Sequence, residues 1–353
     1  MKKRGLLERL KSEKIICAEG FLFEAERRGY LASGEFVPEL ALDKPDALKN
    51  IHIDFQHAGS DVVEAFTYNG HREKMKVIGK ENLLEPLNRA ALKIAKEVAD
   101  NPGEGKERNL LAGNVSNTNI WDPKDKSKQK DVRKMFAEMI KWASDEGVDF
   151  IIGETFYYAE EAYAALDEIK KSGLPSVLTI SPMGENMMRD GVSVIDVCKE
   201  LEQRGADVVG MNCFRGPMTM LPYLKEIRKV INCHMAALPI PYRTNKKQPT
   251  FFNLDDNNGC VCPAPHGRTF PTALDPLYCN RYEIYDFAKT ASSLGINYLG
   301  VCCGAAPMHI REVAEAIGRE VPASKYREKM SNHFMYGSNK RIPKHISKYG
   351  DKA

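Results

Sequence analysis

The feature that most constrains the fold is a series of eight short runs rich in β-branched residues, each followed by apolar residues at helical spacing. Strands that alternate with helices form parallel sheets, and eight strands are the number that closes a barrel. We therefore predict an α/β fold, a (β/α)8 TIM barrel. The predicted strands are Lys14 to Ala18, Asp61 to Phe66, Asn109 to Val115, Asp149 to Glu154, Pro175 to Ile180, Asp207 to Asn212, Cys233 to Leu238 and Asn297 to Cys302.

The spacing of these strands predicts one large insertion. Successive strands begin 26 to 48 residues apart, except that the seventh and eighth begin 64 residues apart. Residues 239–280 between them are rich in Pro, Gly and Asn without a sustained period, so we expect a long loop on the strand-end face. We assign residues 1–322 to the barrel and residues 323–353 to a basic C-terminal tail.

Charge and composition narrow the possible partners and compartments. The net charge is +3, and Lys325 to Ala353 alone holds eight Lys or Arg and two acids, so the positive balance belongs to the tail. We expect this tail to be solvated or to contact another subunit of a homo-oligomer, with no nucleic acid or membrane as partner. No apolar h-region follows Met1 and no run approaches 18 apolar residues, so neither export nor a membrane span is expected.

The cysteines indicate a reducing compartment and a set of ligands. Nine cysteines without framework spacing favour a cytoplasmic location, where thiols serve as ligands, nucleophiles or core residues. Cys260 and Cys262 in the long loop are expected to be incidental, with a redox pair or a second metal as alternatives. Single cysteines elsewhere are typical of buried cores and receive no role: Cys17, Cys198, Cys233 and Cys279.

Three other cysteines are expected to meet at one face of the barrel. The chemistry of such barrels collects at the C-terminal ends of the strands, where Cys213 follows the sixth strand and Cys302–Cys303 ends the eighth. Three thiolates suit zinc, which keeps one tetrahedral position open when it is catalytic. A substrate thiol entering that position loses its proton and stays nucleophilic. The pattern therefore predicts a Zn²⁺ site for alkyl transfer to a thiol.

Two of these segments carry a family resemblance. Gly300-Val301-Cys302-Cys303-Gly304 and Gly210-Met211-Asn212-Cys213 resemble the homocysteine S-methyltransferase family, and further segments match in the same order along nearly the whole chain. The resemblance implies a (β/α)8 barrel with zinc on three cysteines that transfers a methyl group to homocysteine. It implies Cys213, Cys302 and Cys303 as the zinc ligands, and Glu154 as the acid that binds the amino group of homocysteine.

The acceptor side departs from the family pattern near the first strand. The family's acid there falls on Ala18, with Glu19 one place later and Gly20 after it. A residue displaced by one place along a strand normally points elsewhere, so Glu19 substitutes for that acid only if the backbone shifts. We assign Glu19, Gly20 and Thr67 to the homocysteine pocket beside Glu154. Val301 replaces a glycine and is expected to narrow the floor of the site.

The donor side departs further. Betaine-using members of the family place a tryptophan and a tyrosine around the quaternary ammonium and its carboxylate, at positions that are Phe36 and Asn69 here. The tyrosine directly after the Glu154 position is Thr155. Aromatic faces attract onium groups, so an enclosure can still form, with Tyr157 as an additional candidate. The residues assigned to the donor pocket are Phe36, Tyr68, Asn69, Thr155, Gly210, Trp121 and Tyr242.

The expected function is zinc-dependent methyl transfer from glycine betaine to homocysteine, giving methionine and dimethylglycine. The reaction is a direct displacement that needs no general base once the thiol is deprotonated. The altered donor positions motivate an alternative with the same acceptor and a sulfonium donor, either dimethylsulfoniopropionate or S-methylmethionine. An alternative from another class is a non-catalytic zinc-binding or thiol-binding subunit of a larger assembly.

Overall fold

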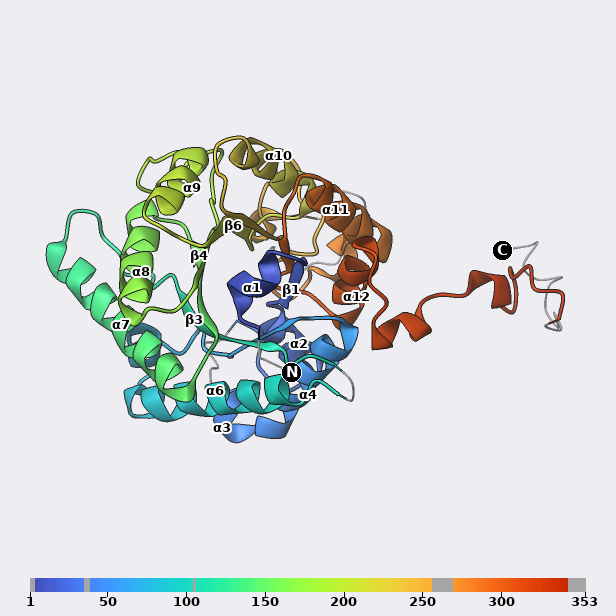
Figure 1. Ribbon diagram of the computed structural model, residues 1–353, viewed down its shortest axis with the longest axis horizontal. Coiled ribbons are helices and arrows are strands. Elements are labelled where there is room, and N and C mark those ends of the chain that lie inside the picture. The colour runs from blue at the N-terminus through green and yellow to red at the C-terminus, as the bar shows by residue number, and fades with distance from the viewer. Residues whose placement is uncertain (1–3, 35–38, 104–105, 256–268, 342–353) are drawn as a thin grey trace.

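A computed structural model describes residues 4–34, 39–103, 106–255 and 269–341, and it shows a closed barrel of eight parallel strands in chain order (Figure 1). The predicted TIM barrel is confirmed, and no strand end lies more than two residues from its predicted position. The strands are β1 Ile15–Ala18, β2 Val62–Glu64, β3 Leu110–Ser116, β4 Phe150–Phe156, β5 Ser176–Ile180, β6 Val208–Asn212, β7 His234–Leu238 and β8 Tyr298–Val301.

Helices surround the barrel and connect its strands (Figure 1). A short first helix, α1 Leu6–Leu10, lies on the barrel axis and buries Leu6 and Leu10 against the residues inside the barrel, so it closes one end. The remaining helices are α2 Phe21–Arg27, α3 Leu40–Asp43, α4 Pro45–Ala58, α5 Arg72–Val77, α6 Leu84–Asp100, α7 Lys126–Glu146, α8 Ala159–Ser172, α9 Val194–Gln203, α10 Pro217–Arg228, α11 Arg281–Ser293 and α12 Pro307–Ala316.

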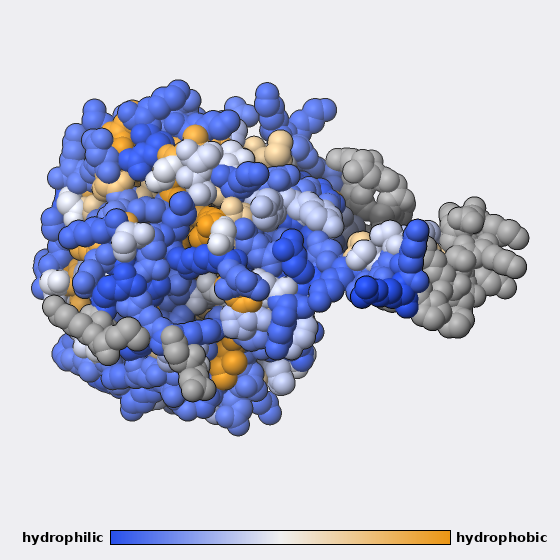
Figure 2. Space-filling view, turned by 45° about the vertical axis from the view of Figure 1, so that its right-hand side comes forward, coloured by the Kyte–Doolittle hydropathy of each residue, from blue (hydrophilic) through white to orange (hydrophobic). Residues whose placement is uncertain are grey.

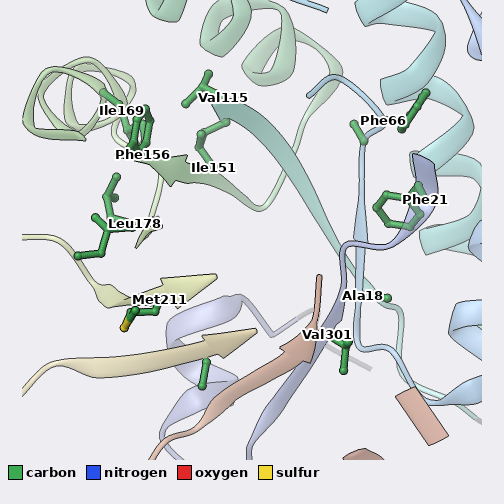
Figure 3. Packing of buried hydrophobic residues seen from close by; sticks show 14 of the residues in the cluster. Ala18, Phe21, Phe66, Val115, Ile151, Phe156, Ile169, Leu178, Met211 and Val301 are labelled. Carbon is green, nitrogen blue, oxygen red and sulfur yellow. The ribbon is translucent and has the colours of Figure 1, made fainter. Parts of the chain in front are cut away.

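Side chains along each strand alternate between two hydrophobic clusters, as the geometry of a strand requires. Residues such as Phe150 and Tyr298 belong to the cluster inside the barrel, whereas their outward neighbours pack beneath the helices (Figure 3). Val301 and Ala18 belong to the outer cluster. The expectation that Val301 narrows the floor of the site is therefore wrong, because its side chain faces the helical layer.

The long loop predicted at residues 239–280 lies between β7 and α11. Its described part contains only two short 3₁₀ turns, η2 Phe251–Asn253 and η3 Asp275–Leu277. Cys260 and Cys262 lie outside the described residues, and the expectation for them stays a prediction. This loop begins at the C-terminal end of a strand, so its described residues stand over the mouth of the barrel.

After α12, the 3₁₀ turn η4 Pro322–Tyr326 still packs against α4 and α12. The chain then leaves the barrel (Figure 1) in an extension that contains η5 Met330–Asn332 and exposes Met330, Phe334 and Tyr336. The division into a barrel and a tail at residue 322 stays a prediction.

The face in Figure 2 is largely hydrophilic, with hydrophobic residues in small separate patches. Within the described ranges, no helix combines the length and the apolar character that crossing a membrane requires.

Close packing of the barrel backbone generates a first prediction. Gly300 in β8 pairs with Cys17 in β1, and a Cβ atom at Gly300 would lie 1.9 Å from the carbonyl oxygen of Cys17. We expect Gly300→Ala to lower the free energy of unfolding by about 3 kcal/mol or more, because strands that close the barrel must separate. Urea unfolding measures the change. Gly184→Ala is the control, since a Cβ there meets no atom within 4 Å, and equal midpoints for both variants would contradict the prediction.

Candidate metal centre and substrate pockets

The three predicted ligand thiols meet at the mouth of the barrel. The Sγ atoms of Cys213, Cys302 and Cys303 all lie within 4.8 Å of one another. Cys213 and Cys302 are buried, whereas Cys303 is partly exposed. Two backbone hydrogen bonds fix the turns that carry them, from Cys213 N to Leu238 O at 2.9 Å and from Cys302 N to Pro239 O at 2.9 Å. The last residue of β7 and the first residue of the long loop thus hold the two thiol-bearing segments in place.

The turn at Cys213 is backbone-strained. Cys213 and Phe214 have φ angles of 52° and 53°, in the left-handed region that L-residues seldom adopt. Each such residue costs on the order of 1–3 kcal/mol and persists where the surrounding structure enforces it. The strain coincides with the position where β6 delivers a candidate ligand, as expected of a functional turn.

The pKa shifts of the three thiols indicate that their full ionisation needs a bound cation. Burial raises the pKa of Cys213 and of Cys302, while hydrogen bonds from these two neighbours lower the pKa of Cys303. Ionising all three thiols at neutral pH therefore requires a positive charge between them. Three clustered sulfur ligands match the preference of zinc and leave one tetrahedral position for another ligand. The residues present fit a catalytic Zn²⁺ site.

Glu154 lies beside the thiols and is held by three hydrogen bonds. Its Oε1 accepts from Asn114 Nδ2 at 2.5 Å, and its Oε2 accepts from Asn212 Nδ2 at 2.7 Å and from Thr155 Oγ1 at 3.0 Å. Burial, followed by the charge of Cys303, raises the pKa of Glu154 to about 7. A substrate ammonium at this carboxylate would offset the cost of burying it.

The structure places Glu19 in the same network. Its side chain is buried, its Oε2 accepts from Asn212 Nδ2 at 3.1 Å, and its carboxylate, that of Glu154 and Cys302 Sγ lie within 4.8 Å of one another. Glu19 Oε1 has no hydrogen-bond partner among the described residues. Cys17 faces the barrel interior and Ala18 faces outward. Glu19, two residues after Cys17, therefore faces the same side as Cys17. The one-place displacement therefore carries the acid into the mouth of the barrel.

A third acid near the thiols, Glu64, was not predicted by the sequence analysis. It is buried at the end of β2 and accepts a hydrogen bond from Asn114 Nδ2, the same nitrogen that donates to Glu154. Burial, followed by the charge of Glu154, raises the pKa of Glu64. Val62 faces the barrel interior and Glu64 lies two residues later on the same strand, so the alternation of side chains along β2 could have indicated that Glu64 also faces inward. Glu64 lines a pocket of about 50 Å³ together with Glu19, Glu154, Cys302 and Cys303.

Two further residues assigned to homocysteine have structural contacts. A Cβ atom at Gly20 would lie 2.7 Å from Ala305, so the turn after β1 approaches the turn after β8 too closely for a side chain. Thr67 is buried and its hydroxyl donates to Asn114 O at 3.3 Å. Neither residue lines the small acidic pocket, although both support segments that do.

A larger, aromatic cavity of about 310 Å³ adjoins the acidic pocket, and Cys213 and Cys303 form part of its wall. Of the residues assigned to the donor, Tyr68 and Asn69 line it, and the Tyr68 hydroxyl accepts from Asn117 Nδ2 at 3.0 Å. Tyr157, the additional candidate, lines it too. Residues that the sequence analysis missed supply most of its aromatic surface: Phe23, Phe214, Phe251, Phe252 and Phe270.

The rings of four of these phenylalanines pack against one another. Ring centroids of Phe251 and Phe252 are 4.7 Å apart, Phe252 lies 4.8 Å from Phe214, and Phe270 lies 4.8 Å from both Phe251 and Phe252. Phe251, Phe252 and Phe270 belong to the long loop, so the loop supplies one aromatic wall. The adjacent Phe251-Phe252 pair in an otherwise polar insertion was the signal that could have found it.

The other donor-side assignments lie elsewhere or outside the described residues. Trp121 is buried in the outer hydrophobic cluster, and Thr155 donates to Glu154 rather than facing the cavity. Tyr242 packs against Phe251 and Gly304, and Gly210 lies against the backbone of β7. Phe36 falls outside the described ranges. A role of these residues in donor binding stays a prediction.

Comparison with known proteins agrees with this geometry. A model of the family described as homocysteine S-methyltransferase matches residues 18–317. The chain is 32% identical to betaine–homocysteine S-methyltransferase 1 of Xenopus tropicalis, covering 90% of this chain and 76% of that protein. It is also 32% identical to S-methylmethionine–homocysteine S-methyltransferase BHMT2 of Pongo abelii, covering 90% and 82%.

A solved structure shows the same fold. The metallated form of the homocysteine methyltransferase MmuM from Escherichia coli superposes with a TM-score of 0.66, covering 86% of this chain and 96% of that one. The sequence identity in this pair is 15%, so the likeness supports the barrel architecture alone.

The thiol cluster generates a second prediction. Replacing Cys213, Cys302 or Cys303 by Ala is expected to weaken zinc binding by more than about 100-fold, because losing even a supporting group around a metal ligand costs roughly 10- to 100-fold. Competition with a chromogenic chelator measures the affinity. Cys198→Ala is the matched control, since Cys198 is buried in α9 away from the cluster. Unchanged affinity in any of the three variants would remove that cysteine from the ligand set.

Proposed function

The chain belongs to the homocysteine S-methyltransferase family, and from this premise we propose that it transfers a methyl group from glycine betaine to homocysteine, giving methionine and dimethylglycine. The observation that carries the proposal is the position of the three thiols between two different pockets. Cys303 lines both the small acidic pocket and the aromatic cavity. An acceptor and a donor bound in these pockets would meet at the thiols.

Cys213, Cys302 and Cys303 would hold Zn²⁺, which when bound lowers the pKa of a substrate thiol and so supplies a thiolate at neutral pH. Glu154 accepts the ammonium group of homocysteine and thereby orients the substrate sulfur. Asn114 and Asn212 keep both oxygens of Glu154 in place through the hydrogen bonds described above. The acceptor is therefore bound at two points, which fixes the direction from which its sulfur attacks.

The aromatic cavity binds the onium group of the donor. The faces of Tyr157, Phe214 and the loop phenylalanines attract a cation, and an apolar wall excludes water. The sulfur lone pair forms the new S–CH₃ bond while the N–CH₃ bond breaks, and that bond's electron pair stays on nitrogen to give a neutral tertiary amine. Since a thiolate and an onium cation neutralise each other in this step, exclusion of water favours it.

A sulfonium donor is the second candidate. The changed donor positions Asn69 and Thr155 favour it, and so does the similarity to a relative named for S-methylmethionine. Either donor class reacts with the same acceptor by the same displacement. The alternatives differ only in which onium compound fills the aromatic cavity.

The third prediction separates the donors. The zinc-loaded protein is incubated with homocysteine and, in turn, glycine betaine, dimethylsulfoniopropionate or S-methylmethionine, and methionine is measured by mass spectrometry. We expect methionine and dimethylglycine in equal amounts with glycine betaine. A higher kcat/KM with a sulfonium compound than with glycine betaine would identify that sulfonium compound as the preferred donor. Absence of methionine with all three donors would contradict the proposed function.

The fourth prediction concerns the acceptor. Glu154→Gln is expected to raise the KM for homocysteine by about 10- to 100-fold, because a charge-assisted hydrogen bond to the ammonium group is lost. The KM for the donor should change little. Glu160→Gln, at an exposed acid on α8, is the control. If the KM for homocysteine were the same in both variants, Glu154 would not bind the acceptor.

A further inference from the structure

The aromatic cavity contains a buried lysine that the proposed mechanism does not use. Lys74 on α5 is 3% exposed and lines the cavity. Its Nζ donates to the carbonyl oxygen of Tyr68 at 3.1 Å and lies 4.2 Å from the centroid of the Tyr68 ring. These two contacts hold the ammonium group on the cavity wall.

The charge distribution in the cavity is uneven. Among the described residues that line the cavity are one lysine, Lys74, and one carboxylate, Glu26. Glu26 is partly exposed, so water screens it, whereas Lys74 is buried among apolar walls. Lys74 therefore places a cationic group inside the cavity, where screening by water is weak.

A buried ammonium group acts differently on the two ends of a methyl donor. It repels an onium group and attracts a carboxylate, and both effects are strong where water is excluded. Burial lowers the pKa of Lys74 to about 7, against the opposing charges of Glu154 and Glu161. An incoming carboxylate would therefore stabilise the charged form of Lys74.

The position of Tyr68 brings this cation close to the reaction. Tyr68 lines both the aromatic cavity and the small acidic pocket. Its carbonyl oxygen accepts from Lys74 Nζ and from Ser116 Oγ at 3.0 Å, and its hydroxyl accepts from Asn117. The residue that separates the two pockets is thus rigidly held, and Lys74 is held against it.

Resting on the proposed function, we infer that Lys74 binds the carboxylate of the methyl donor and selects onium compounds that carry an anionic group over onium compounds that lack one. The aromatic rings hold the onium end and Lys74 holds the anionic end of the same molecule. Glycine betaine and the sulfonium alternatives all carry a carboxylate in addition to the onium group, whereas choline carries the same trimethylammonium group as glycine betaine with a hydroxyl in place of the carboxylate.

The experiment compares binding of glycine betaine and choline to the zinc-loaded protein by isothermal titration calorimetry. Lys74→Met is expected to weaken glycine betaine binding by about 10- to 100-fold, the value of one charge-assisted hydrogen bond, without weakening choline binding. Lys76→Met, at an exposed lysine on the same helix, is the matched control and should change neither. Equal losses for both compounds, or no loss for glycine betaine, would overturn the inference.

A comparison within the wild-type protein covers the case in which Lys74→Met does not fold. The unaltered protein is expected to bind glycine betaine at least about 10-fold more tightly than choline, and equal affinities would overturn the inference. Calorimetry needs no turnover, so the result is independent of methionine formation. Tight glycine betaine binding with no methionine formed would refute the proposed function and leave the role of Lys74 supported.

Discussion

The side-chain amide of Asn212 is the interaction on which the rest of the site depends. Its Nδ2 donates to Glu154, Glu19 and Thr155 Oγ1, and its Oδ1 accepts from the backbone N–H of Thr155 at 3.0 Å. The next residue in the chain is Cys213. One asparagine at the end of β6 therefore fixes Glu154, the acid proposed to orient the acceptor, relative to the neighbouring thiol. Buried polar groups with this many partners allow few alternative arrangements.

The two pockets differ in how they are built. The acidic pocket is formed by side chains at strand ends, and the closed barrel determines their relative positions. The aromatic cavity is formed partly by α5 and partly by Phe251, Phe252 and Phe270 from the long loop. Rigid strands suit the recognition of one acceptor, whereas helix and loop residues can be replaced without disturbing the barrel.

Much of the acceptor side could be predicted from the sequence, because strand periodicity places residues at known positions. The eight strands, the convergence of Cys213 with Cys302 and Cys303, and the burial of Glu154 follow from local patterns. The inward direction of Glu19 could not be settled, since it depends on whether the alternation that turns Cys17 inward and Ala18 outward continues past the end of β1. The aromatic wall was missed because its residues come together only through non-local contacts of a loop without periodicity.

The left-handed turn at Cys213 and Phe214 has an evolutionary consequence. One pair of adjacent residues supplies both a thiol of the candidate metal centre and an aromatic face of the cavity proposed for the donor, so a substitution that reshapes the turn would alter both proposed substrate sites at once. Phe251, Phe252 and Phe270 in the described part of the long loop line the aromatic cavity and supply no thiol. Descendants of this protein could therefore acquire new methyl donors by changing the loop while the turn stays fixed, and donor preference would diverge faster than acceptor preference.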